Sequence, residues 1–236
     1  MGDTRRVSDT PSREPGPCDC PACPNIFNDA AAEDSLRRYR RKGPDSTTRE
    51  LIEAIVAEGI SGASVLDIGG GIGAIQLELL AAGAAETVSV DASPPFVAAA
   101  RTEAARRGFG DRARHLEGDL VALAEAVEPA DVVTLDRMVC CYNDMPGLVA
   151  RSIDHARRMI GLVYPRDAWW TRSLARVMTA VNRVTRGKLR WYIHSEAALD
   201  GLIRDGGFER RYLRRHLLWQ VALYVRASPE AEGGPA

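Results

Sequence analysis

Long apolar segments and lysine are what this sequence has least of. No apolar run approaches the roughly 20 residues that a membrane-spanning helix needs, and the longest candidate, residues 217–225, is interrupted by Gln220. The polar, proline-rich N-terminus contains no apolar signal region, so we expect a cytoplasmic protein. Lysine stands only at positions 42 and 188, and the formal net charge is −1. No overall field therefore attracts the chain to nucleic acid or to an anionic membrane.

The composition is that of a folded domain with polar ends. Hydrophobic residues make up 45% and charged residues 27% of the 236 residues, as in a medium-sized globular domain with some additions. The segment 1–24 is rich in proline and poor in apolar side chains, so we expect a disordered tail. We further expect a helical cap at 25–60, the principal domain at 61–226 and a second disordered tail at 227–236.

Cysteine is sparse, with five in the chain. In a cytoplasmic protein these are expected to be reduced rather than paired. Cys18, Cys20 and Cys23 stand close together and could hold zinc if a fourth ligand came from elsewhere. Because the chain has no second Cys-x-x-Cys, the pattern favours idle thiols in a flexible tail. We assign no metal site, and the sequence leaves metal binding by these three thiols open.

The most informative stretch is a short apolar run that ends in glycines, Ser64 to Gly73. Val65 to Ile68 predicts a strand buried on both faces, and Ala74 to Leu80 predicts a helix. Strand, glycine turn and helix open a βαβ unit. Glycines there allow a sharp turn and expose backbone N–H groups at the positive end of a helix, which predicts a nucleotide-like ligand rather than an ordinary turn.

Two cofactor patterns overlap at this turn. Gly69-x-Gly71-x-x-Ala74 is a permitted form of the dinucleotide fingerprint, so an NAD(P)-dependent oxidoreductase remains an alternative. The spacing also fits Asp-x-Gly-x-Gly-x-Gly, formed by Asp67, Gly69, Gly71 and Gly73. That pattern resembles motif I of the class I S-adenosylmethionine-dependent methyltransferases. A carboxylate suits an ammonium or sulfonium group better than a pyrophosphate.

Two later acids follow predicted strands. Asp91 ends the strand at 86–91 and lies 20 residues beyond Gly71, where a carboxylate can accept hydrogen bonds from ribose hydroxyls. It could also cap the helix that begins near Ala92. We place Ala92 in the cofactor site together with Asp91. Gly118-Asp119 closes the strand at 112–119 and resembles the methyltransferase motif whose acid binds the adenine amino group. The backbone of Leu120 would then touch the ring. A dinucleotide fold does not require an acid at Asp119.

The remaining strands complete the sheet. Residues 129–136 predict a central strand whose last residue, Asp136, faces the same crevice as Asp67 and Asp91, because ligands in open α/β sheets gather at that edge. Residues 158–164 predict a fifth strand, and 208–214 with 218–226 predict an antiparallel pair. We therefore predict an α/β, Rossmann-like sheet of seven mostly parallel strands with an antiparallel last strand. Helical lid elements are expected at about 166–205.

The cap at 25–60 contains two predicted helices. Residues 30–42 end in a basic run in which Tyr39 is the one aromatic residue. Either this is a solvated helix end favoured by the helix dipole, or Tyr39 and an arginine cover the cofactor, as N-terminal helices do in many methyltransferases. The second helix begins at Thr47-Thr48-Arg49-Glu50, whose spacing predicts a capping box.

Together, residues 46–226 resemble a class I methyltransferase. A narrower resemblance, to the magnesium-protoporphyrin O-methyltransferases, rests on Ile26-Phe27-Asn28, on the pattern from Leu135-Asp136 to Tyr142 and on the late lid helices. In that family a tyrosine precedes Phe-Asn and a histidine precedes the later tyrosine. This sequence has Ile26 and Cys140 or Cys141 at those places, which argues against that substrate.

The resemblance implies S-adenosylmethionine as cofactor and a small organic methyl acceptor, with transfer to oxygen. If a base removes the acceptor proton, the candidates near the crevice are Tyr142, Asp144, Tyr164 and His194, of which we select Tyr142 and His194. The absence of an obvious base keeps a third possibility open, a protein that binds the cofactor without transferring its methyl group. The sequence assigns neither the acceptor nor an oligomeric state.

Overall fold

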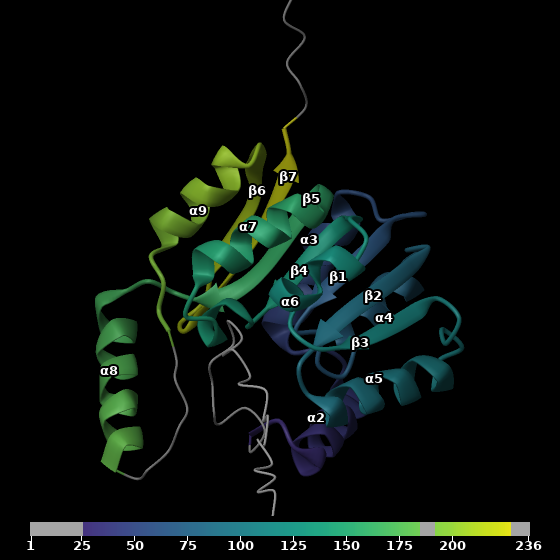
Figure 1. Ribbon diagram of the computed structural model, residues 1–236, viewed down its shortest axis with the longest axis horizontal. Helices are drawn as coiled ribbons and strands as arrows, with labels where there is room; N and C mark the ends of the chain where they lie inside the picture. Colours follow the sequence, from purple (N-terminus) through teal and green to yellow (C-terminus); the bar gives the residue numbers. More distant parts are fainter. Residues whose placement is uncertain (1–25, 185–191, 228–236) are drawn as a thin grey trace, which may run out of the picture.

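The computed structural model describes residues 26–184 and 192–227, which form one seven-stranded sheet (Figure 1). The strand order is β3-β2-β1-β4-β5-β7-β6, and β7 alone runs antiparallel to its neighbours. This confirms the predicted fold class. The strands are β1 (Ser64–Ile68), β2 (Glu86–Asp91), β3 (Ala113–Glu117), β4 (Ala130–Asp136), β5 (Ala156–Pro165), β6 (Phe208–Arg215) and β7 (Trp219–Arg226).

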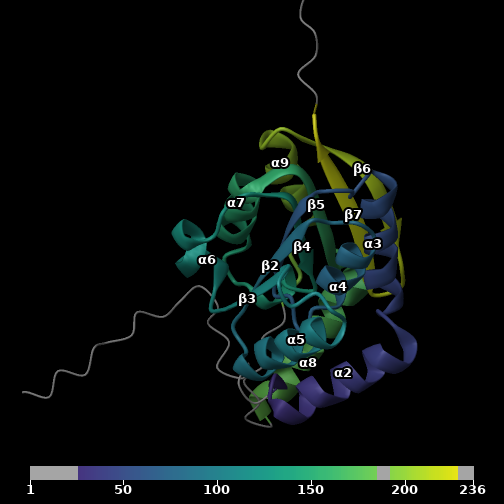
Figure 2. The ribbon, with the colours of Figure 1, turned by 90° about the vertical axis from the view of Figure 1, so that its right-hand side faces the viewer.

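Helices cover both faces of the sheet (Figures 1 and 2). One face carries α3 (Ser46–Ala57), α4 (Ala74–Ala81) and α5 (Pro94–Arg106). The other carries α6 (Leu120–Leu123), α7 (Met145–His155) and α9 (Glu196–Asp205). Short 3₁₀ turns at Ala124–Ala126 and Val139–Cys141 follow α6 and β4, the second being η2. α9 packs against α7 and β6 and so belongs to the helical layer of the sheet.

The two layers explain why the central strands are continuously apolar. Neighbouring residues of a strand point to opposite faces. In β1, Val65 therefore packs into the core under α3, α4 and α5, while Leu66 packs into the core under α6, α7 and α9. Val132 and Val133 of β4 divide in the same way. Both cores are needed, because a parallel sheet is stable only when both of its faces are covered.

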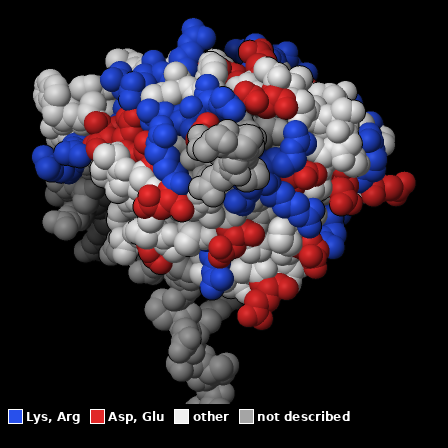
Figure 3. All heavy atoms as spheres, turned by 90° about the horizontal axis from the view of Figure 1, so that it is seen from above, with Lys and Arg blue, Asp and Glu red and all other residues white. Residues whose placement is uncertain are grey.

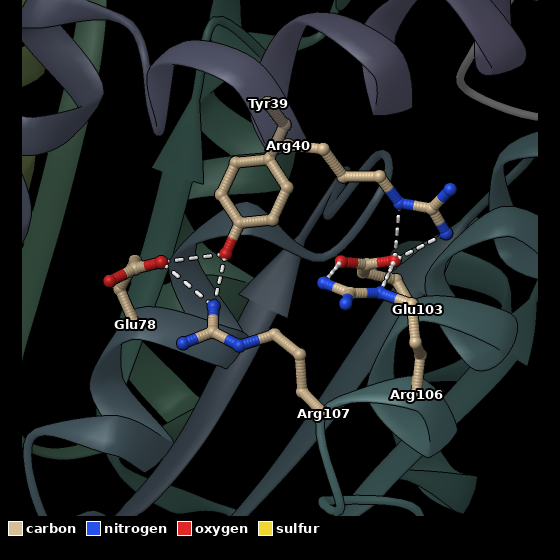
Figure 4. A network of polar contacts seen from close by, with 6 residues as sticks. All are labelled: Tyr39, Arg40, Glu78, Glu103, Arg106 and Arg107. Atoms are coloured by element: carbon tan, nitrogen blue, oxygen red, sulfur yellow. Dashed lines mark hydrogen bonds and ion pairs between the residues drawn. The ribbon is translucent and has the colours of Figure 1, made fainter.

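A polar network attaches the N-terminal helix α2 (Asp29–Lys42) to the domain (Figure 4). Arg40 on α2 donates two hydrogen bonds to the fully buried carboxylate of Glu103 on α5, at 2.7 and 2.9 Å. Tyr39 on α2 donates to Glu78 on α4 at 2.6 Å, and Arg107, which follows α5, contacts both groups. Few apolar side chains of α2 are buried, so these contacts fix its position.

The helix α8 (Trp169–Val184) stands at the side of the sheet in Figure 1. Its first residue, Trp169, is 80% exposed, and Val177 further along is 59% exposed. None of the helices in the described part of the chain is both long and apolar enough to cross a membrane. Seen from above, Arg, Lys, Asp and Glu side chains are interleaved on the surface (Figure 3), which favours short-range pairing over a field of one sign.

Some sequence predictions concern residues outside the described part of the chain, and one prediction is wrong. The tails at 1–24 and 228–236, and with them Cys18, Cys20 and Cys23, lie outside the described residues. Cys140 and Cys141 are thiols and not disulfide partners within the described ranges. The capping box predicted at Thr47 is wrong. α3 begins one residue earlier, with Asp45 at its N-cap and no side-chain cap hydrogen bond. The hydroxyls of its first turn are instead used at the site described below.

The attachment of α2 yields a testable prediction. Glu103→Ala removes the buried acceptor shared by Arg40 and Arg106. Since both arginines are partly exposed and can be rehydrated, we expect a loss of about 1–3 kcal/mol in the free energy of unfolding, measured by urea denaturation. Asp34→Ala, which removes only two exposed pairs within α2, should change the value by less than about 0.5 kcal/mol. Equal losses in the two variants would contradict the assignment.

Candidate active site

A cavity of about 210 Å³ lies at the carboxyl edge of β1 and β4, beneath α2. Its walls come from the N-terminal helices, from the glycine turn after β1 and from the end of β4. Ligands of open α/β sheets bind in this place, where the strand order reverses. The lining residues are Ser35, Arg38, Tyr39, Gly43, Pro44, Asp45, Thr48, Asp67, Gly69, Gly70, Gly71, Ile72, Ala74, Ile75, Phe96, Asp136 and Arg137.

The glycine turn exposes backbone to this cavity. Gly69, Gly71 and Gly73 have φ of 69°, 54° and 81°, which L side chains rarely adopt. Gly70 is required for a different reason, close approach. A Cβ there would lie 2.7 Å from the amide of Gln76 and 3.0 Å from Oδ2 of Asp67. A bulkier residue at Gly70 would therefore push against the carboxylate beneath the turn.

Asp67 is buried under this turn and 1% exposed. Thr134, directly across the β1–β4 register, donates to its Oδ1 at 2.6 Å, and Gln76 donates to its Oδ2 at 3.4 Å. Burial outweighs these hydrogen bonds and raises the pKa of Asp67 to about 7. A cation bound in the cavity would compensate the charge that burial disfavours.

Asp136 supplies a second carboxylate to the cavity. Thr48, on the first turn of α3, donates to its Oδ2 at 2.5 Å. Oδ1 is buried, lacks a hydrogen-bond partner among the described residues and lies 3.8 Å from Nε of Arg137. Burial raises the pKa of Asp136. The sequence pointed to this acid, but it did not show that α3 would hold it.

Asp91 binds two backbone N–H groups, and the ribose role predicted for it from the sequence stays a prediction. Its Oδ1 accepts from the backbone N–H of Ser93, and its Oδ2 accepts from that of Gly71, each at 2.8 Å. The first contact shapes the entry to α5 and the second fixes the glycine turn. Each oxygen keeps a lone pair for a ligand hydroxyl. Ala92 beside it is exposed.

Asp119 is held from both sides. Its Oδ1 accepts from the N–H of Val121 at 2.8 Å, which caps α6, and its Oδ2 accepts from the hydroxyl of Tyr142. Leu120, next in the chain, is buried. Tyr142 is completely buried, so its hydroxyl serves Asp119.

His194 contacts the loop after β4, which contains Tyr142. Its Nε2 is 2.9 Å from the carbonyl oxygen of Tyr142, and its ring stacks on Tyr192 with centroids 5.9 Å apart. Because a carbonyl only accepts, Nε2 donates, and Nδ1 of the neutral ring is then the nitrogen that can take a proton. Of the two residues selected as proton acceptors, His194 has the nitrogen for that role.

Tyr39 lines the cavity, as the cofactor-covering interpretation requires, but its hydroxyl points into the network with Glu78 and Arg107 (Figure 4). Burial, reinforced by the Glu78 carboxylate, raises the pKa of Tyr39 above its usual range, so the phenol stays protonated. Its ring and not its hydroxyl is therefore available to a ligand. Arg38 of α2 lines the same cavity.

The sequence did not point to Arg137. It is the one non-glycine residue with positive φ, 57°, in the described ranges. Its guanidinium donates to Asp45 and Thr47 at 3.1 and 2.9 Å, and it lies over the ring of Trp219. A left-handed conformation in a residue with a long side chain marks a position fixed by its surroundings. No local sequence signal predicts it.

Comparison with known proteins agrees with this geometry. Residues 65–159 match the family described as "Methyltransferase domain". The ribosomal protein L11 methyltransferase of Deinococcus radiodurans is 36% identical over 114 residues, which cover 47% of this chain and 42% of that protein. This chain therefore spans less than half of the curated relative that it matches.

The solved structures that share the fold include two with a TM-score of 0.65. Magnesium protoporphyrin IX methyltransferase from Synechocystis PCC 6803, with bound SAH, has a TM-score of 0.65 at 20% identity, covering 86% of this chain and 99% of that one. An O-methyltransferase family protein from Burkholderia thailandensis also has a TM-score of 0.65, at 18% identity, covering 92% and 66%.

Residues 65–159 thus match a methyltransferase domain, and the sheet has the strand order of the S-adenosylmethionine-dependent methyltransferase fold. The residues present fit that cofactor. Two carboxylates, the buried Asp67 and the largely buried Asp136, suit its cationic end, and Oδ1 of Asp136 has no hydrogen-bond partner among the described residues. The glycine turn leaves the space that the rest of the molecule needs. An NAD(P)-dependent oxidoreductase, the alternative left by the glycine pattern, is set aside.

Asp67 makes stability depend on pH in a predictable direction. Its pKa is about 7 when folded and 3.8 for an unperturbed aspartate, so between these values the folded protein binds more protons than the unfolded chain. The contribution of Asp67 to the free energy of unfolding therefore falls as pH rises, by up to about 1.4 kcal/mol per pH unit. Asp67→Asn should flatten urea-unfolding stability between pH 4 and 7.

The asparagine can be accommodated, since Oε1 of Gln76 lacks a partner among the described residues and can accept from the new amide after a flip. A wild-type stability that rises across this range relative to Asp67→Asn would contradict the prediction.

Proposed function

We propose that this protein is an S-adenosylmethionine-dependent methyltransferase that acts on a small organic acceptor and transfers the methyl group to oxygen. The observation that carries the proposal is the pairing of Asp67 and Asp136 in one cavity beneath the glycine turn. The names of the similar structures, a magnesium protoporphyrin IX methyltransferase and an O-methyltransferase family protein, support an oxygen acceptor.

Each part of the site has a role in this proposal. Asp67 and Asp136 bind the ammonium end of the cofactor, and the rest of the cofactor lies along the glycine turn, where Gly69, Gly71 and Gly73 present no side chains. Asp91, with Ala92, receives the ribose hydroxyls. Asp119 receives the adenine amino group, and the backbone of Leu120 lies against the ring. Tyr39 closes the cavity from α2.

The cofactor, when bound, supplies an activated methyl group. The chain must then exclude water, align the acceptor oxygen and remove its proton. Tyr39 and α2 cover the cavity on one side. We assign proton removal to Nδ1 of His194, and we assign Tyr142 to the support of Asp119 rather than to proton transfer, because its hydroxyl is buried and donates to that carboxylate.

A macromolecular acceptor is the second candidate, supported by the name of the ribosomal protein L11 methyltransferase that the chain matches over 114 residues. The third is a protein that binds the cofactor without methyl transfer. An assay that detects release of S-adenosylhomocysteine separates these. Turnover with small hydroxyl or carboxyl compounds supports the first, turnover only with ribosomal protein supports the second, and binding without turnover supports the third.

Calorimetric titration tests the cofactor. S-adenosylmethionine and S-adenosylhomocysteine should bind in the micromolar range, and NAD should give no heat. Asp91→Ala and Asp119→Ala should each weaken S-adenosylhomocysteine binding about tenfold or more, since each loses a charge-assisted hydrogen bond. Asp111→Ala, in an exposed turn, is the control and should bind as the wild type does. Unchanged affinity in both site variants would contradict these assignments.

The base has its own test. His194→Gln retains an amide donor for the carbonyl of Tyr142 but lacks a proton acceptor of comparable basicity. With an acceptor whose hydroxyl is not ionised, kcat should fall about 10²- to 10⁴-fold, with the Kd for S-adenosylhomocysteine unchanged. An acceptor that is already ionised should rescue the rate. Wild-type kcat in His194→Gln with the neutral acceptor would exclude His194 as the base.

A further inference from the structure

Two parts of the site that are distant in sequence meet at the loop after β4. Asp119 follows β3 and caps α6 on one side of this loop, and residues 192–194 lie on the other side, before α9. The loop is the turn η2 together with Tyr142. Its contacts to each side differ in kind. Side-chain atoms bind Asp119, and backbone carbonyls bind 192–194.

The contact to Asp119 fixes the orientation of its carboxylate. The hydroxyl of Tyr142 donates to Oδ2, and the N–H of Val121 donates to Oδ1. A carboxylate bound at both oxygens cannot rotate freely, so its remaining lone pairs point in set directions. A ligand amino group would meet a preorganised acceptor, and that acceptor depends on Tyr142 remaining where it is.

The contacts to the other side use the same short loop. The N–H of Tyr192 donates to the carbonyl of Cys140 at 2.9 Å, and Nε2 of His194 donates to the carbonyl of Tyr142 at 2.9 Å. The ring of His194 also stacks on Tyr192. The position of His194 therefore depends on the backbone of Tyr142. The hydroxyl of the same residue binds Asp119.

We propose that Tyr142 is a positioning residue that couples the adenine end of the cofactor site to the segment 192–194, so that a ligand amino group on Asp119 orders His194. This rests on the proposed function, which assigns the adenine amino group to Asp119 and proton removal to His194. The burial of Tyr142, which is 0% exposed, suits it to transmit a constraint, because a fully packed ring cannot shift without moving the loop.

The coupling predicts a dependence on one functional group of the ligand. S-adenosylhomocysteine carries the 6-amino group, whereas S-inosylhomocysteine has a carbonyl at that position and lacks the exocyclic donor assigned to Asp119. Tyr142→Phe should weaken S-adenosylhomocysteine binding about tenfold and leave binding of S-inosylhomocysteine within about twofold of the wild type, as measured by calorimetry. Weakening of both ligands by the same factor would indicate a merely structural role and would overturn the proposal.

The rate of amide hydrogen exchange at Tyr192 measures how strongly the segment 192–194 is ordered. In the wild type, saturating S-adenosylhomocysteine should slow exchange of this N–H several-fold more than saturating S-inosylhomocysteine does. This comparison needs no variant, so it decides the matter even if Tyr142→Phe does not fold. Equal protection by the two ligands would overturn the proposal.

Tyr224→Phe is the matched control. Tyr224 is also completely buried and donates to a carboxylate, that of Asp200, at 2.8 Å. Its loss should reduce stability comparably without changing the preference between the two ligands. Failure of the wild type to bind S-adenosylhomocysteine would instead overturn the proposed function. Binding by the wild type with an unchanged affinity in Tyr142→Phe would overturn only the role of Tyr142.

Discussion

The site depends on a carboxylate buried where burial is unfavourable. Asp67 lies under the glycine turn with Thr134 and Gln76 as its hydrogen-bond partners, and these do not offset the loss of water around the charge. The turn can close over it only because Gly70 has no side chain. The same constraint reduces the stability of the free protein and would be relieved by a bound cation, as the proposed function requires. The proposed function therefore uses a charged group, Asp67, whose burial is unfavourable in the folded protein without its ligand.

The sheet lies on one side of the cavity that contains this carboxylate, and α2 lies on the other side. The sheet and its two apolar cores hold Asp67 and Asp136. By contrast, α2 is attached mainly through hydrogen bonds and ion pairs centred on Glu78 and Glu103 (Figure 4). Contacts of this kind are directional and sensitive to salt. A cover held in this way can be positioned accurately with little apolar burial.

The loop after β4 contacts Asp119 on one side and the segment 192–194 on the other. Tyr142 was selected from the sequence as a proton acceptor because it follows the fourth strand. In the fold its hydroxyl donates to Asp119, and its carbonyl accepts from His194. The position of Tyr142 after the fourth strand therefore does not by itself define its role. The direction of its hydrogen bonds identifies what it can do.

The sequence determined the strand–glycine–helix opening, the order of the strands along the chain and the acids at the ends of β1 to β4, because these depend on local periodicity and on spacing within one βαβ unit. Tertiary structure decided which groups meet these acids. Thr134 reaches Asp67 through strand register, and Thr48 reaches Asp136 because α3 begins one residue before its predicted cap. Arg137 takes a left-handed conformation that no neighbouring residue dictates. Long-range packing sets these contacts, and local sequence carries no record of it.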